Sequence, residues 1–133
     1  MKRISVVDDN PVLIKVLRLG LESAGYEVDS SSDGLEFLKK LDHRAPDALI
    51  TDIQMPNIGG KELCISIDKQ MPDRQFPIVV MTSSSEPEHR EWADQISNLK
   101  FMEKPISIRR LLAHLDECLN SSAYISNNGP VDS

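Results

Sequence analysis

The fold is decided first by residues 4–11, ISVVDDNP, in which a strand signal passes directly into a helix signal. Residues 4–7 form a mostly β-branched run, which is typical of a short buried strand. Asn10 suits the N-cap of a helix and Pro11 its first position. Apolar residues then recur at helical spacing until Gly25, which predicts the end of that helix. We therefore expect the chain to open with one β-α unit.

Four more units of the same kind follow along the chain. Their strands are expected around residues 26–28, 47–53, 76–81 and 99–102. The five expected helices carry apolar stripes that comprise Leu13, Val16, Leu17 and Leu21; Leu35, Leu38 and Leu41; Leu63, Cys64 and Ile67; Trp92, Ala93 and Ile96; and Ile108, Leu111, Leu112, Leu115 and Leu119. Continuous apolar strands that alternate with helices favour a parallel sheet covered on both faces. The sequence therefore predicts one doubly wound α/β domain with five strands and five helices.

Length and composition limit the classes of protein that fit. At 133 residues, of which 40% are hydrophobic, the chain suits one globular domain with its own core. We expect that domain at residues 1–120, followed by a flexible tail or linker stub at 121–133, which is rich in Ser, Asn and Gly. No apolar run reaches the ~18–20 residues of a membrane span, and the first apolar run is too short for a signal peptide.

Charge and cysteine content limit the expected partners and the expected cellular compartment. The formal net charge of −6 argues against direct binding of nucleic acid by this domain. Cys64 and Cys118 lie in apolar helical patterns without metal-binding spacing, so both are expected to be small buried side chains in a reducing compartment. We therefore expect a cytoplasmic protein that does not associate with membranes.

Polar side chains stand where the expected strands end. The set consists of Asp8 and Asp9 after the first strand, Asp52 after the third, Thr82 and Ser83 after the fourth, and Lys104 after the fifth. In an open parallel sheet, ligands bind outside the carboxyl ends of the strands. These side chains are therefore expected to meet in one pocket.

The chemistry of this set points to phosphate. Two carboxylates ~4 Å apart repel each other by roughly 4 kcal/mol at an effective dielectric of ~20, and a hard divalent cation such as Mg²⁺ relieves that repulsion. Thr82 and Lys104 offer hydrogen-bond donors that suit phosphoryl oxygens. A carboxylate can itself accept a phosphoryl group. The residues predict a site that receives phosphate on an aspartate.

In these residues the sequence resembles the receiver domain of two-component response regulators, the family of the chemotaxis regulators. The resemblance rests on Asp8-Asp9 after a β-branched run, Asp52 followed by Met55-Pro56 and Gly60, Thr82 after an apolar strand, and Lys104-Pro105. It covers about residues 2–120, and the intervals of 30 residues from Asp52 to Thr82 and 22 from Thr82 to Lys104 fit the family. It implies a flavodoxin-like sheet with the strand order 2-1-3-4-5.

The resemblance also implies a role for each site residue. Asp52 would be the phosphoacceptor. The ligands of Mg²⁺ (or Mn²⁺) would be the side chains of Asp9 and Asp52, Asp8 mostly through a water, and the backbone carbonyl of Gln54. The phosphate-binding and switch residues would be Thr82, Ser83, Lys104 and Phe101, and Lys104-Pro105 would be a cis peptide bond.

Three positions bear on how such a switch would behave. Gln54 and Ser84 would tune the lifetime of the phosphoryl group, which we expect to be moderately long. Phe101 lacks the hydroxyl of the tyrosine often found at this position, so no hydrogen bond from a hydroxyl can hold its rotamer. Ser97-Asn98 replaces the usual Gly-Ala before the fifth strand, which leaves the conformation of that loop open.

The implied function is a phosphorylation-controlled signalling switch, not a multiple-turnover enzyme. A sensor histidine kinase or phosphotransfer protein would donate the phosphoryl group. The surface of the fourth helix, fifth strand and fifth helix would then change and bind a downstream effector or a second copy of the chain.

Two other functions stay open at this point. A phosphohydrolase of the haloacid-dehalogenase type would need a second carboxylate where Gln54 stands. A structural interaction domain with a vestigial site is opposed by the complete set of acids.

Overall fold

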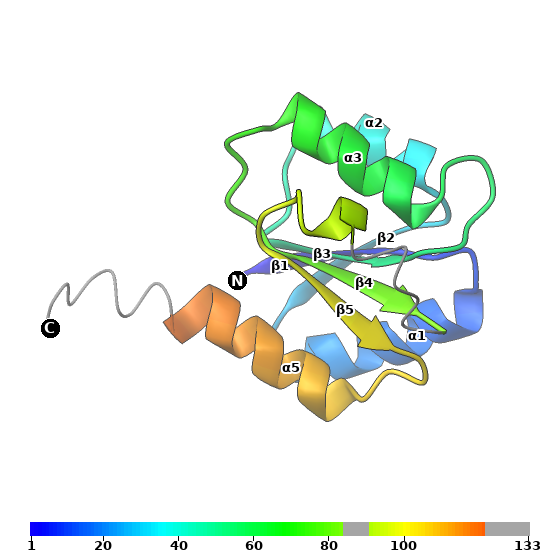
Figure 1. The fold of residues 1–133 in the computed structure, drawn as a ribbon. Coiled ribbons are helices and arrows are strands. Elements are labelled where there is room, and N and C mark those ends of the chain that lie inside the picture. The colour runs from blue at the N-terminus through cyan, green and yellow to red at the C-terminus, as the bar shows by residue number, and fades with distance from the viewer. Residues whose placement is uncertain (84–90, 122–133) are drawn as a thin grey trace, which may run out of the picture.

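The computed structural model describes residues 1–83 and 91–121 (Figure 1). Its elements are β1 (Arg3–Val7), α1 (Pro11–Ser23), β2 (Glu27–Ser31), α2 (Gly34–Leu41), β3 (Ala48–Asp52), α3 (Gly60–Gln70), β4 (Ile78–Thr82), β5 (Leu99–Glu103), α5 (Ile108–Asp116) and the π-helix η1 (Glu117–Ser121). Residues 91–93 are also helical. Residues 84–90, between β4 and the expected fourth helical stripe, and nearly all of the expected tail lie outside the described residues.

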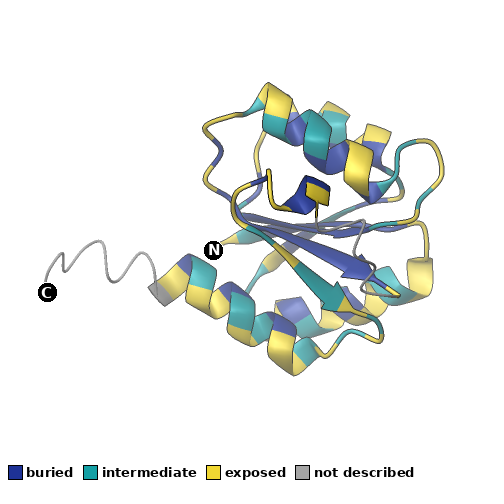
Figure 2. Cartoon of the chain, in the orientation of Figure 1, coloured by how far each residue is buried: buried dark blue, intermediate teal, exposed yellow. Residues whose placement is uncertain are grey.

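The five strands form one parallel sheet in the order β2-β1-β3-β4-β5. The helices α2 and α3 cover one face of the sheet, and α1 and α5 cover the other (Figure 1). The inner strands β3 and β4 are buried along their whole length, whereas β5 at the edge is partly exposed (Figure 2). The predicted doubly wound fold and its strand order are confirmed.

Each face of the sheet has its own apolar core, because successive strand residues point to opposite faces. Val6 packs with Leu17 in the core beneath α1 and α5. Val7, its neighbour in the chain, packs with Phe37 in the core beneath α2 and α3. Cys64 lies in this second core, and burial raises the pKa of its thiol to about 12, as befits a small buried side chain.

Two residues of the expected apolar stripes are exposed, and Cys118, which the sequence predicts to be buried, is only partly buried. Val16 is 48% exposed and Leu35 is 44% exposed. The sheet contacts the face of α1 that carries Leu17 and the face of α2 that carries Phe37. One residue along a helix is a turn of about 100°, so Val16 lies to the side of the buried face. Cys118, in η1, packs only partly against the core beneath α1 and α5.

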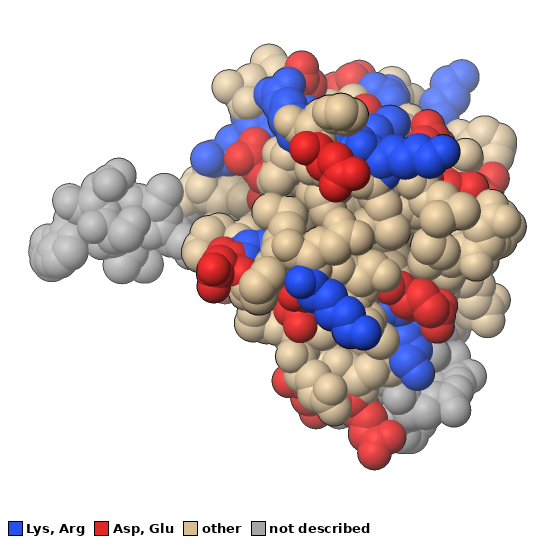
Figure 3. Space-filling model, turned by 90° about the horizontal axis from the view of Figure 1, so that it is seen from above, with Lys and Arg blue, Asp and Glu red and all other residues tan. Residues whose placement is uncertain are grey.

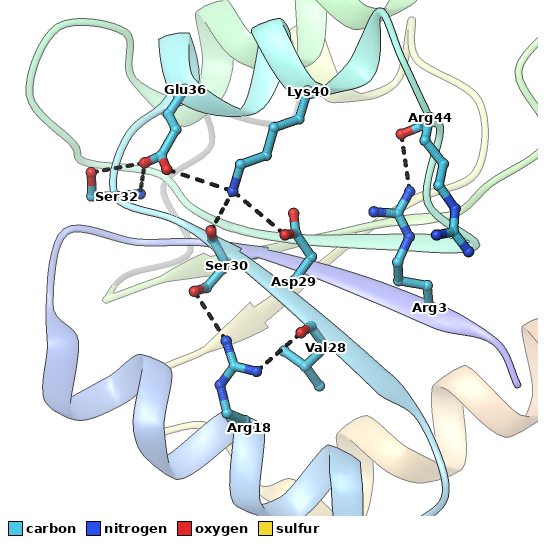
Figure 4. Close-up of polar contacts among 9 residues, drawn as sticks. All are labelled: Arg3, Arg18, Val28, Asp29, Ser30, Ser32, Glu36, Lys40 and Arg44. Carbon is cyan, nitrogen blue, oxygen red and sulfur yellow. Dashed lines mark hydrogen bonds and ion pairs between the residues drawn. The ribbon is translucent and has the colours of Figure 1, made fainter.

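Charged side chains cover the free edge of β2 (Figure 4). Lys40 Nζ donates to the carbonyl oxygen of Ser30 at 2.6 Å and lies 3.5 Å from Asp29 Oδ1. From the other face of the sheet, Arg18 donates to the carbonyl oxygen of Val28 at 3.0 Å and to Ser30 Oγ at 3.2 Å. The outward carbonyls of this edge strand therefore accept hydrogen bonds from α1 and α2.

The outer face of the layer formed by α2 and α3 carries charges of both signs side by side (Figure 3). One such pair joins Glu36 and Lys40 on α2 at 3.5 Å. Asp33 caps the N-terminus of α2, because its Oδ1 accepts a hydrogen bond from Glu36 N at 2.9 Å. Glu36 in turn accepts from Ser32 N at 2.7 Å, and this bond lowers the pKa of Glu36.

Arg74 connects the loops before β4 and β5 through hydrogen bonds. Its buried guanidinium donates to the carbonyl oxygen of Phe76 at 2.9 Å and to that of Ser97. Asn98 adopts a left-handed backbone with φ 61°, and its side chain donates to the carbonyl oxygen of Gln75 at 3.3 Å. Asparagine tolerates this conformation better than most residues. The unusual Ser97-Asn98 pair is thus held by the loop before β4.

Replacing Arg74 by methionine is expected to lower the free energy of unfolding by about 1.5–3 kcal/mol, because two carbonyl groups lose a charged donor. Urea denaturation measures this difference. The matched control is Arg44→Met: the Arg44 side chain is 68% exposed and lies 3.9 Å from Glu27, so its loss should cost less than about 0.5 kcal/mol. Equal effects in the two variants would contradict the assigned role of Arg74.

Candidate functional site

The candidate site lies at the edge of the sheet where the strands end, marked by the arrowheads in Figure 1. Asp8 and Asp9 directly follow β1, and Asp52 is the last residue of β3. Thr82 is the last residue of β4, and Lys104 follows β5. Because all four strands are parallel and adjacent, residues up to 96 positions apart in the chain arrive at one edge.

The three acids form one cluster. Asp8, Asp9 and Asp52 each place a carboxylate oxygen within 4.8 Å of the other two. Asp8 is 1% exposed and Asp52 is 6% exposed, whereas Asp9 is exposed to solvent. Lys104 Nζ lies 2.9 Å from Asp52 Oδ1 and supplies one positive charge beside the three negative ones.

Asp8 shows that the charges of this cluster are incompletely balanced. Its Oδ1 accepts a hydrogen bond from Asn10 N at 2.8 Å, but its buried Oδ2 has no hydrogen-bond partner. Burial raises the pKa of Asp8, and the nearby charges of Asp52 and Asp9 raise it further. An all-oxygen set with an unsatisfied buried carboxylate oxygen fits a hard divalent cation such as Mg²⁺.

We expect Mg²⁺ binding to weaken on acidification at a higher pH than an ordinary aspartate would cause. Protons and Mg²⁺ compete for the carboxylate of Asp8, so affinity should fall by up to about tenfold per pH unit once the pH drops below the raised pKa. Calorimetric Mg²⁺ titrations at a series of pH values measure the effect. Asp8→Asn serves as the control and should give a flatter pH dependence; parallel curves would contradict the prediction.

In the absence of metal, acidification should raise the free energy of unfolding through Asp8, whereas it lowers the affinity for Mg²⁺. The pKa of Asp8 in the folded protein lies above the unfolded value of 3.8, so the folded state binds this proton more tightly. Acidification through the raised pKa toward 3.8 therefore relieves a destabilising charge. Metal binding and metal-free stability should thus respond to this one proton in opposite directions.

The remaining site residues take up different positions. Thr82 is buried, and its carbonyl oxygen accepts a hydrogen bond from Lys104 N at 2.7 Å. The peptide bond between Lys104 and Pro105 is cis. Ser83 and Gln54 are exposed at the rim of the site. The expected tuning residue Ser84 lies outside the described residues.

The loop between β3 and α3 is held by residues to which the sequence alone assigned no role at the site. Asn57 has a left-handed backbone with φ 68°, and its side chain donates to Asp33 Oδ2, at the N-cap of α2, at 2.9 Å. Gly60 N donates to the carbonyl oxygen of Ile53 at 2.8 Å. A Cβ atom on Gly60 would lie 2.5 Å from the carbonyl oxygen of Asp52. The turn residues in MPNIGG, residues 55–60, were the available signal.

Phe101 lies on β5 and is partly buried. Its ring makes an edge-to-face contact with Trp92, with 5.7 Å between ring centroids and 82° between planes. Phe101 and Thr82 also line one cavity of about 690 Å³ along β5 and α5. The predicted switch position therefore borders both a buried ring and an open space.

A doubly wound parallel sheet in the order β2-β1-β3-β4-β5, with three acids, a hydroxyl residue and a lysine at its strand ends, places the domain in the flavodoxin-like class. The family model for the response regulator receiver domain matches residues 4–116. The chain belongs to this family. Receiver domains of response regulators are signalling switches, and the family binds Mg²⁺ at an acidic pocket of this kind.

Curated relatives show the same relationship in sequence. The chain is 33% identical over 121 residues to the alkaline phosphatase synthesis transcriptional regulatory protein PhoP of Bacillus subtilis, covering 91% of this chain and 50% of PhoP. It is 32% identical over 118 residues to the transcriptional regulatory protein GlrR of Escherichia coli, covering 89% of this chain and 26% of GlrR. The chain thus spans half or less of the length of these two relatives.

Solved structures agree with the fold. The chemotaxis protein CheY4 of Vibrio cholerae superposes with a TM-score of 0.81 at 28% identity, covering 90% of this chain and 99% of CheY4. A CheY-like receiver domain protein of Methanospirillum hungatei gives 0.84 at 26% identity, covering 93% and 98%. Within the described residues, no helix is long and apolar enough to span a membrane.

Proposed function

We propose that Asp52 accepts a phosphoryl group from a sensor histidine kinase or phosphotransfer protein in a Mg²⁺-dependent reaction. The observation that carries this proposal is the environment of Asp52, which is buried at 6% exposure, clusters with two further acids and lies 2.9 Å from the ammonium of Lys104. Gathering buried charges of one sign is costly for folding, and such arrangements concentrate at functional sites. The proposal places the domain in the cytoplasm and gives it no direct contact with nucleic acid or membrane.

The residues divide the chemistry among them. A carboxylate oxygen of Asp52 attacks the phosphorus, and the bond between phosphorus and donor breaks with its electron pair leaving on the donor. Lys104 holds the Asp52 carboxylate beforehand and then pairs with a phosphoryl oxygen. Thr82 moves to donate its hydroxyl hydrogen to the new group.

The acid cluster would hold the cation beside this reaction. Asp8, Asp9 and Asp52, together with the backbone carbonyl of Gln54, are the oxygen ligands that Mg²⁺ prefers. Bound there, Mg²⁺ would neutralise charge on the phosphoryl oxygens. Ser83, at the end of β4, offers a further donor at the rim of the site.

The output surface would be that of the fourth helix, β5 and α5, and of the fourth helix the structure describes residues 91–93. The cavity of about 690 Å³ opens along this surface and has both basic and acidic side chains in its lining, including Lys100, Arg110, Glu103 and Glu117. Phosphorylation would alter this surface and with it the binding of a downstream effector or of a second copy of the chain. Surfaces with charges of both signs suit a partner of complementary pattern.

Acetyl phosphate with Mg²⁺, followed by intact-mass spectrometry, tests the proposal. The wild-type protein should gain the mass of one phosphoryl group, and EDTA should prevent the gain. Asp52→Ala should gain nothing, whereas Asp42→Ala, at an exposed position after α2, should behave like the wild type. An unchanged gain in Asp52→Ala would overturn the proposal.

The same samples address two finer points. A single stoichiometric adduct favours a switch, whereas repeated turnover on a phosphate monoester would favour a phosphohydrolase. We expect the adduct to outlast the first seconds, because Gln54 and Ser84 are proposed to permit a moderately long lifetime. Loss within seconds without a phosphatase would contradict that expectation.

A further inference from the structure

Trp92 is the only tryptophan in the sequence, and it contacts Phe101, the proposed switch residue. It is 7% exposed and belongs to the core beneath α2 and α3. It lies in the helical stretch 91–93, seven residues before Leu99, the first residue of the edge strand β5. Its ring meets that of Phe101 edge to face at 82°. This geometry places the positive edge of one ring against the negative face of the other.

Phe101 borders both a buried ring and a cavity. Its ring contacts Trp92, and it packs against the core beneath α2 and α3. It also lines the cavity of about 690 Å³ that Thr82 lines. A phenylalanine carries no hydroxyl, so ring packing must supply the orientation that a tyrosine could gain from a hydrogen bond. Any large rotation of Phe101 must break the contact with Trp92.

We propose that Trp92 is a positioning residue of the switch. Its ring holds Phe101 in the arrangement described above, and activation at Asp52 proceeds only as the Trp92–Phe101 contact breaks and Phe101 turns toward Thr82. This inference rests on the proposed function, because it assigns to Trp92 a part in the response to phosphorylation. It makes the helical stretch 91–93, and not β5 alone, part of the moving unit.

The strength of one aromatic pair sets the expected change in ligand affinity. A contact made only in the inactive arrangement biases the equilibrium against activation. Removing it should raise the apparent affinity for beryllofluoride with Mg²⁺, a mimic of the phosphoryl group, by about 2- to 10-fold. Trp92→Leu removes the aromatic edge, and Trp92→Phe retains a ring.

Two measurements test the inference. In the wild type, adding beryllofluoride and Mg²⁺ should change the Trp92 fluorescence emission, and Phe101→Leu should abolish most of that change. Fluorine NMR titrations should show tighter beryllofluoride binding in Trp92→Leu and wild-type binding in Trp92→Phe. A merely structural role for Trp92 would lower stability in both variants without selectively tightening the ligand.

The outcomes separate this inference from the proposed function. If wild-type protein gains no phosphoryl group from acetyl phosphate and Mg²⁺, the proposed function fails. If it gains the group while Trp92 emission stays constant and Trp92→Leu binds beryllofluoride as the wild type does, the role of Trp92 alone is refuted. The emission measurement uses unaltered protein, so it decides the question even if Trp92→Leu does not fold.

Discussion

Lys104→Met is expected to slow phosphorylation of Asp52 by about 100-fold or more while it tightens Mg²⁺ binding. Lys104 Nζ lies 2.9 Å from Asp52 Oδ1, beside the proposed phosphoryl position. Removing one preplaced donor from a site of developing negative charge typically costs about 10²–10³ in rate. The same removal leaves the three acids without their neighbouring cation, so a divalent ion should bind more strongly.

This prediction is specific because the phosphorylation rate should fall while the affinity for Mg²⁺ rises. The initial rate of mass gain with acetyl phosphate at saturating Mg²⁺ gives the first quantity, and calorimetric Mg²⁺ titration gives the second. Lys100→Met is the matched control, because Lys100 lies exposed on β5 and away from the acid cluster. A parallel loss of both quantities in Lys104→Met would point to a disordered site and contradict the assigned role.

Gly60→Ala is expected to destabilise the fold and to displace the phosphoacceptor. The added Cβ would lie 2.5 Å from the carbonyl oxygen of Asp52 and 2.8 Å from the Cα of Ile53, both of which are backbone atoms. Alanine would gain up to about 1 kcal/mol in helix propensity. Overpacking against rigid backbone costs about 1–3 kcal/mol, so the clash should prevail. A shift of Asp52 by about 1 Å can slow its reaction by about 100-fold.

Gly59→Ala provides the comparison at the preceding position. Its Cβ would meet Glu62 Oε1 at 2.9 Å, which is the end of a flexible side chain, and the carbonyl oxygen of Ile53 at 3.2 Å. We expect a loss of less than about 1 kcal/mol in urea denaturation and a smaller fall in phosphorylation rate. Equal losses of stability and phosphorylation rate in Gly60→Ala and Gly59→Ala would contradict the idea that the close approach of α3 to β3 positions Asp52.

The fold was predictable from sequence because its signals are local. Apolar runs such as residues 78–81 predict buried strands, and capping residues such as Asn10 predict helix starts. The meeting of Asp8, Asp9 and Asp52 was predictable from topology, since parallel strands end at one edge.

Other features depend on tertiary contacts that a single sequence does not display. Val16 and Leu35 belong to the expected apolar stripes and are nevertheless exposed, because spacing alone does not fix which side of an apolar stripe contacts the sheet. The Arg74 contacts to the loop at Ser97 and the ring contact of Trp92 with Phe101 join segments by packing, so no local pattern predicts them.

The hydrogen bonds from Arg18 and Lys40 to the outer carbonyls of β2 have a consequence for behaviour in concentrated solution. A strand from another molecule could align along that border only after displacing two charged donors. Each displaced cation would also have to find new partners or water. The border is thereby protected against the stepwise sheet extension that leads to fibrils.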